Sequence, residues 1–153
     1  MKSFLNKPHN IFWLTALYIF ITGYVTYVRL GDSALDINIH DTYYVMAHSH
    51  TLFILILFYA LLGFIYFILK LSKAPLIKAL TKVHVFVCIS AIFIDDIGKI
   101  ILRQVYGDNI LFNYYGYYQY LTLCLIALVV LAQILFIFNI IFSLIKSIQI
   151  KAQ

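Results

Sequence analysis

Long runs of apolar residues, separated by short polar segments, constrain this chain more than any other feature of its sequence. A transmembrane helix needs about 20 mainly apolar residues, because it rises about 1.5 Å per residue through a hydrocarbon core about 30 Å thick. Four segments approach this length, at residues 11–28, 43–69, 76–96 and 121–145. The 153 residues are 64% hydrophobic and only 11% charged, which excludes an ordinary soluble domain. The sequence therefore predicts an all-α integral membrane four-helix bundle, one domain over residues 1–153.

The third segment is the most polar of the four and contains Lys78, Lys82 and His84. We expect the two lysines to lie at its start, where long side chains can reach the membrane surface. Asp95, Lys99 and Arg103 follow at spacings of four. Residues four apart share one helix face, so they predict a helical extension beyond the membrane that carries ion pairs.

The basic residues fall mainly on one side of these segments. Eight of the eleven Lys and Arg lie there, namely Lys2, Lys7, Lys70, Lys73, Lys78, Lys82, Lys146 and Lys151. All six acids lie on the other side. By the positive-inside rule both termini are expected in the cytoplasm, most simply at a bacterial inner membrane. The net charge of +5 is thus explained by membrane topology and does not indicate nucleic acid.

The second segment begins with H-D-T-Y-Y-V-M-A-H-S-H at residues 40–50. Ionisable side chains inside a membrane are costly, so they indicate a functional site. His40, Tyr44 and His48 are spaced by four, so in a helix they share one stripe, which excludes His40 if that residue lies in the preceding loop. His50 lies about 200° around the helix from His48, so the two imidazoles face opposite sides. They are suited to two separate cofactors or two different neighbours, and not to one metal ion.

Haem fits these histidines better than a simple metal ion does. The chain contains no Glu, and neither Glu nor Cys stands at a depth that would complete a closed metal site. Haem needs only one or two axial nitrogens and an apolar slot. The alternative is that the histidines bond across helices as packing residues, which is our interpretation of His84. Cys88 and Cys124, each within an apolar run, are interpreted as small buried hydrophobic residues.

The run L-D-I-N-I-H-D-T-Y-Y-V-M-A-H-S-H at residues 35–50 resembles the tenth helix of subunit I of haem-copper oxidases, whose pattern is L-D-x-x-x-H-D-T-Y-Y-V-x-A-H-x-H. Thr22-Gly23 and Lys82-Val83-His84 resemble parts of the ninth and eleventh helices more weakly. The whole chain therefore resembles the four C-terminal helices of that subunit, cytochrome c oxidase subunit I among them.

The resemblance implies a role for each matching residue. The position of His48 ligates the haem of the oxygen-reducing centre, and that of His50 ligates the low-spin haem. His40 and Asp41 match residues near haem propionates and a non-redox metal on the outer, periplasmic side. The candidate cofactor-binding residues are therefore His40, Asp41, Tyr43, Tyr44, His48 and His50, with His48 and His50 as ligands of haem iron.

Three functions remain open from the sequence. The first is a haem-binding membrane protein, with b-type haem expected, that works in electron transfer or in gas and redox sensing, with a homo-oligomer as one expected state. The second is a subunit of a larger respiratory oxidase complex, and the third is a non-haem scaffold or transport component. No catalytic residue is predicted, because the family's copper ligands and cross-linked tyrosine lie on helices without a counterpart here. Oxygen reduction by this chain alone is therefore not expected.

Overall fold

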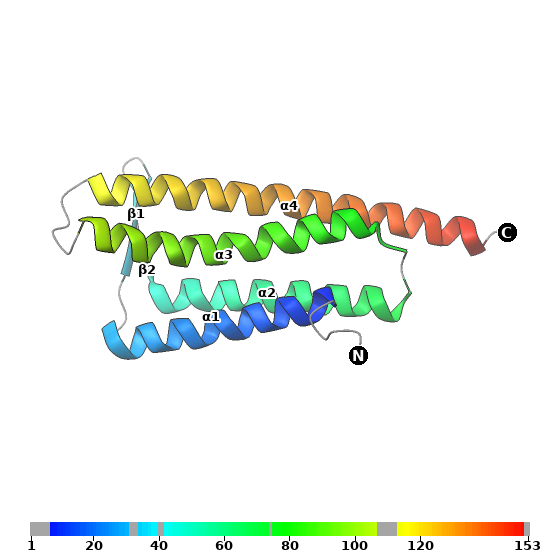
Figure 1. Cartoon of the computed structure of the whole chain (residues 1–153), viewed down its shortest axis with the longest axis horizontal. Coiled ribbons are helices and arrows are strands. Elements are labelled where there is room, and N and C mark those ends of the chain that lie inside the picture. Colours follow the sequence, from blue (N-terminus) through cyan, green and yellow to red (C-terminus); the bar gives the residue numbers. More distant parts are fainter. Residues whose placement is uncertain (1–6, 31–33, 40–41, 74, 107–112, 152–153) are drawn as a thin grey trace. The chain divides into compact units, whose positions relative to one another are not determined.

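The order of elements along the chain is four long helices with one β-hairpin inserted between the first two (Figure 1). The computed structural model describes residues 7–30, 34–39, 42–73, 75–106 and 113–151. The elements are α1 (Pro8–Leu30), β1 (Ala34–Ile39), β2 (Thr42–Ala47), α2 (His48–Leu71), α3 (Lys78–Tyr106) and α4 (Asn113–Lys151). The four helices confirm the expected all-α membrane fold. The chain divides between Ser72 and Lys73 into two compact units.

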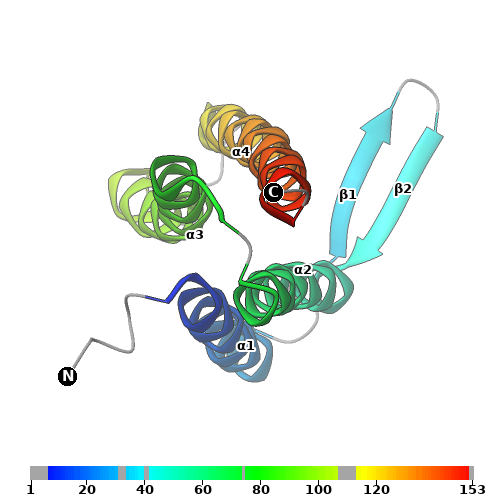
Figure 2. The ribbon, with the colours of Figure 1, turned by 90° about the vertical axis from the view of Figure 1, so that its right-hand side faces the viewer.

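In the first unit α1 and α2 pack against each other as an antiparallel pair (Figure 2). Two glycines allow the helices to approach closely. A Cβ at Gly23 would lie 2.8 Å from Leu52 Cδ1, and a Cβ at Gly63 would lie 2.4 Å from Trp13 Cδ1. Next to the second of these points the Phe12 ring stacks on Tyr66 of α2, with centroids 5.5 Å apart. Aromatic stacking and close backbone approach therefore fix which face of α2 turns toward α1.

The second helix starts later than its apolar pattern predicted. The prediction of a helix from Tyr43 is wrong, because residues 42–47 form strand β2 and α2 begins at His48. Strand β2 pairs antiparallel with β1, from Ala34 opposite Ala47 to Ile39 opposite Thr42. The run T-Y-Y-V is β-branched and aromatic, a composition that favours strands. Residues 34–39 form hydrogen bonds with its backbone, so residues 42–47 adopt a strand and the helix starts after them.

In the second unit α3 and α4 form another antiparallel pair. The polar side chain of Asn139 joins α4 to the chain that enters α3. Its Oδ1 accepts a hydrogen bond from Ile77 N–H at 2.9 Å, and its Nδ2 donates to Ile77 O at 3.3 Å and Thr81 Oγ1 at 3.1 Å. At the other end a Cβ on Gly98 would lie 2.8 Å from Leu121 Cδ2. The two helices thus stay in contact along most of α3.

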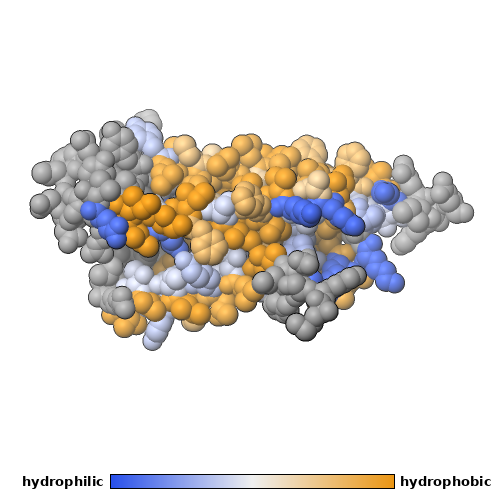
Figure 3. Space-filling model, in the orientation of Figure 1, coloured by the Kyte–Doolittle hydropathy of each residue, from blue (hydrophilic) through white to orange (hydrophobic). Residues whose placement is uncertain are grey.

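Three helices in the described part of the chain are long and apolar enough to cross a membrane, over Pro8–Val28, Ser49–Leu71 and Tyr120–Ile148. Hydrophobic side chains accordingly make up most of the coloured surface in Figure 3. The uncharged run of α3 extends only from Val83 to Ile94, roughly 18 Å at about 1.5 Å per residue. The expected third span therefore stays a prediction, whereas the helical extension past residue 96 is confirmed to Tyr106.

Candidate functional site

The histidine motif of residues 40–50 is divided between strand β2 and helix α2. His40 and Asp41 lie outside the described residues, between the strands. Tyr43 and Tyr44 belong to β2, paired with Asn38 and Ile37. His40, Tyr44 and His48 therefore do not form the stripe expected of one continuous helix.

His48 and His50 both lie in the first turn of α2. Residues two positions apart in a helix are separated by about 200° around its axis, so these positions fall on opposite sides, as the spacing predicted. Residues in line with position 48 recur every three or four positions and include Leu52, Tyr59 and Leu62. Tyr59 and Leu62 are buried, and Leu52 packs against Gly23 of α1. Position 48 is therefore in line with the side of α2 that α1 covers.

The side of α2 in line with His50 is uncovered in this unit. His50 is exposed, and so are the apolar residues that follow it at helical spacing. Phe53 is 66% exposed, and Ile54, Leu57, Leu61 and Phe64 continue the same face toward the other end of the helix. We call this set, from His50 to Phe64, the His50 face. It places an accessible imidazole at the end of an extended apolar surface.

Contacts between α1 and α2 hold the His50 face outward. Trp13 packs edge-on to His9 at 5.6 Å and tilts against Phe67 at 5.7 Å, and its ring covers Gly63. His9 itself is 4% exposed. Gly63 has no side chain and so leaves room for the Trp13 ring. If α2 rotated about its axis, another residue would take the place of Gly63 and its side chain would overlap with that ring. The rotation of α2, and with it the direction of the His50 face, is thus determined by packing far from the motif.

A second group of polar side chains lies between α3 and α4. His84 is fully buried, its Nε2 lies 3.2 Å from Gln133 Oε1, and its ring stacks on Phe136 with centroids 4.5 Å apart. Gln133 Nε2 in turn donates to Cys88 Sγ at 3.3 Å. This arrangement confirms the interpretation of His84 as a packing residue. Cys88 is buried, as expected, whereas the same expectation is wrong for Cys124, because that side chain lies on an exposed side of α4.

The sequence interpretation missed the polar partners on α4. Gln133, Asn139 and Ser143 interrupt the apolar run of that helix, and Asn139 and Ser143 are buried. Their position in the sequence could have revealed them, because a polar side chain deep inside an apolar helix usually forms a hydrogen bond to a neighbouring helix. The Oγ of Ser143 has no hydrogen-bond partner among the described residues.

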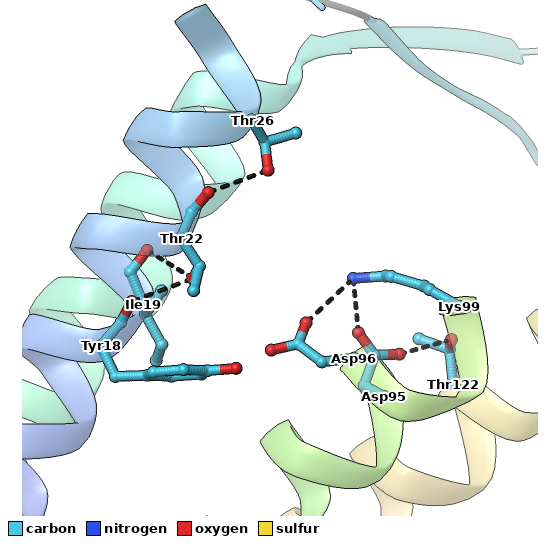
Figure 4. Close-up of polar contacts among 8 residues, drawn as sticks. All are labelled: Tyr18, Ile19, Thr22, Thr26, Asp95, Asp96, Lys99 and Thr122. Atoms are coloured by element: carbon cyan, nitrogen blue, oxygen red, sulfur yellow. Dashed lines mark hydrogen bonds and ion pairs between the residues drawn. The ribbon is translucent and has the colours of Figure 1, made fainter. Parts of the chain in front are cut away.

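Of the ion pairs expected on the helical extension, the one between Asp95 and Lys99 is present (Figure 4), and the side chain of Arg103 lies outside the described part of the structure. Lys99 Nζ lies 2.7 Å from Asp95 Oδ2 and 3.9 Å from Asp96 Oδ1. Thr122 of α4 donates its Oγ1 hydrogen to Asp95 Oδ1 at 3.2 Å. Figure 4 also shows threonines of α1 that donate hydrogen bonds to carbonyls of the same helix, such as Thr22 Oγ1 to Tyr18 O at 2.9 Å.

No group of three or more His, Cys, Asp or Glu side chains that could hold a metal ion comes together within the described ranges.

Comparison with known proteins relates part of this chain to one protein. It is 45% identical over 50 residues to cytochrome c oxidase subunit 1 of Mytilus edulis, a match covering 32% of this chain and 9% of the relative. It is 44% identical over 52 residues to that of Plasmodium falciparum, covering 33% and 11%, and 33% identical over 88 residues to that of Candida albicans, covering 55% and 17%. The matches thus span less than a fifth of the length of these relatives. No family model matches the chain, and no solved structure does. The chain is a membrane protein similar, over part of its length, to cytochrome c oxidase subunit 1.

Proposed function

We propose that this chain is a haem-binding integral membrane protein, related to subunit I of haem-copper oxidases, in which His50 is an axial ligand. The observation that carries the proposal is the His50 face, an exposed histidine followed by an uncovered apolar surface. Haem is a flat, largely apolar group that needs an imidazole nitrogen and apolar walls. Bound there, it would supply an iron that gains and loses one electron.

The residues of the His50 face fit one side of such a group. His50 would hold the iron, and Phe53, Ile54 and Leu57 would cover the ring and exclude water from it. The described helix pair supplies one wall, so the second wall comes from elsewhere. A second copy of the chain or other membrane subunits would provide it, together with a sixth ligand. This is why we place a homo-oligomer or a respiratory complex among the expected assemblies.

His48 is proposed as the ligand of a second haem, following the resemblance of the motif. Its position is in line with the α1-covered side of α2, so this second site needs room beside the outer end of α1. We therefore expect the site at His50 to be filled first. His40, Asp41, Tyr43 and Tyr44 are proposed to surround the polar edge of the cofactor, and b-type haem is the expected form.

The proposed topology has both termini in the cytoplasm and the histidine motif on the outer side of a bacterial inner membrane. The support is the distribution of lysines. Lys7 precedes α1, Lys70 lies in the last turn of α2, Lys78 begins α3 and Lys146 lies near the end of α4. An excess of Lys and Arg marks cytoplasmic connections.

Visible spectra of the purified full chain test the proposal. The protein is expressed in haem-replete cells, extracted in mild detergent and recorded oxidised and reduced. We expect a Soret band that His50→Ala weakens strongly and His48→Ala weakens less, and that the double variant lacking both histidines loses. His84→Gln is the matched control, because that histidine is buried between α3 and α4, and it should leave the band unchanged. A chain without haem, or one whose haem survives in the double variant, would refute the proposal.

The partial similarity to a subunit of an oxidase favours a second function, a subunit of a larger respiratory complex. In that case other chains would cover the His50 face. Purification from the native membrane through a tag would then recover further membrane subunits in fixed ratio. A stable homo-oligomer that carries its own haem would contradict this alternative, and a haem-free homo-oligomer would leave the non-haem scaffold or transport component.

A further inference from the structure

Four exposed lysines gather in the second unit where α3 begins and α4 ends, and we call them the basic end. They are Lys73, Lys78, Lys82 and Lys146. Lys78 begins α3, and the first turn of this helix contains no acid. Lysines at a helix N-terminus are repelled by the positive end of the helix dipole, by about 0.3–1 kcal/mol each. The basic end therefore favours an anion.

The acids described in this unit lie too far away to supply that anion. Asp95 and Asp96 pair with Lys99 in the second half of α3. Lys82 and Asp95 are thirteen positions apart, roughly 20 Å along a helix that rises about 1.5 Å per residue. Surface charges separated by that distance are largely screened, because the Debye length is about 8 Å at physiological salt. The acids described in this unit therefore do not compensate the charge of the basic end.

The basic end lies beside the last turns of an apolar helix. Asn139 of α4 bonds to Ile77 and Thr81, which flank Lys78 in the sequence. The apolar segment of α4 continues to Ile148. If α4 spans the membrane, as its length and composition allow, these bonds place Lys78 and Lys82 within reach of one membrane surface. Their long side chains can then extend to the lipid headgroups.

Below the two lysines the same side of α3 becomes apolar. Lys78, Lys82 and Phe86 follow one another at intervals of four, which keeps them on neighbouring positions of one helix side. Phe86 is 72% exposed, and Val83 beside it is also exposed. Cations at headgroup depth followed by an exposed aromatic ring at acyl-chain depth match a molecule that is anionic at one end and apolar along its length. A free phosphate ion would make no use of Phe86.

The backbone that carries the lysines is already held in place. Thr81 lies between them, donates a hydrogen bond to Ile77 O at 3.1 Å and accepts one from Asn139 Nδ2 at 3.1 Å. Binding there orders only the lysine side chains, which keeps its entropic cost low. We propose that the basic end binds an anionic phospholipid, with its phosphate against Lys78 and Lys82 and an acyl chain along Phe86.

Lipid retention by the purified full chain tests this proposal. The protein is equilibrated with mixed micelles of phosphatidylglycerol and phosphatidylcholine, re-isolated, and its bound lipid is measured by mass spectrometry. We expect retained lipid to be enriched in phosphatidylglycerol over the supplied mixture. Each lysine removed in Lys78→Gln and Lys82→Gln should lower this enrichment by about fivefold, since a Lys near an anionic surface contributes about 1 kcal/mol. Lys99→Gln is the matched control on the same helix and should retain the enrichment.

Two further arms distinguish a bound phospholipid from a bound phosphate ion. The double variant Lys78→Arg/Lys82→Arg keeps both charges and should keep the enrichment, and inorganic phosphate in excess should not displace the lipid. The proposal is overturned if wild-type protein retains both lipids in the supplied ratio, a result that needs no variant to fold. It is also overturned if the glutamine variants, folded by circular dichroism, retain as much phosphatidylglycerol as wild type, or if phosphate displaces the lipid.

Discussion

Gly63 is the position where one added methyl group should disturb the first unit most directly. In Gly63→Ala the new Cβ would lie 2.4 Å from Trp13 Cδ1, 2.5 Å from Trp13 Nε1 and 3.2 Å from the backbone carbonyl of His9. The indole can turn away, but it then loses its contacts with His9 and Phe67. Each aromatic contact contributes about 0.5–1.5 kcal/mol, so the loss is roughly 1–3 kcal/mol. Alanine regains about 1 kcal/mol in helix propensity, which leaves a net loss of up to roughly 2 kcal/mol.

Trp13 is the only tryptophan in the chain, so its fluorescence reports on this site alone. We expect Gly63→Ala to change the emission maximum of the folded protein and to lower the midpoint of unfolding by SDS in mixed micelles. Gly98→Ala is the matched control, because its Cβ would meet only the terminal Cδ2 of Leu121, which can rotate away. That variant should unfold at the same or a higher SDS fraction. Unchanged emission and stability in Gly63→Ala would refute the packing argument.

Three further substitutions test contacts in the second unit. Asn139→Leu removes two hydrogen bonds to Ile77 and should lower the free energy of unfolding by about 1–3 kcal/mol, which SDS titration measures. His84→Leu leaves Gln133 without its imidazole partner, and the same titration should show a loss of about 1–2 kcal/mol, whereas replacing both residues by Leu should cost less than the sum. Lys99→Ala breaks a half-exposed ion pair and should change stability by less than about 1 kcal/mol, so a larger thermal shift would show that the pair is part of a wider network.

The helices were predictable because membrane spans depend on length and polarity, two properties that a sequence displays directly. Residues 11–28 and 121–145 lie inside α1 and α4, and residues 48–69 of the second segment lie inside α2. The start of α2 was not predictable from apolarity, because T-Y-Y-V suits a strand as well as a helix. Pairing with residues 34–39 selects the strand. This pairing is a contact between two segments, and the local sequence of either segment does not reveal it.

The candidate site was predictable in part for a similar reason. The opposite placement of positions 48 and 50 follows from helix geometry once both residues are helical, and both are in α2. Which of the two sides is covered depends on Gly23, Gly63 and Trp13, whose contacts arise only when α1 packs on α2. No spacing within the motif contains that information. Likewise His84 was recognised as a packing residue, but its partner Gln133 lies 49 positions away.

The direct junction between β2 and α2 has a consequence for how related sequences should be compared. Strand β2 ends at Ala47 and the helix begins at His48 with no residue between them. The direction in which the two-stranded ribbon leaves α2 therefore depends on the number of residues at this junction. One inserted residue there would turn the ribbon by about 100° around the helix axis. An insertion between the strands, at residues 40–41, would leave that direction unchanged. Chains that keep the spacing from Thr42 to His50 should thus hold the ribbon on the same side of the histidine helix, whatever the length of their hairpin loop.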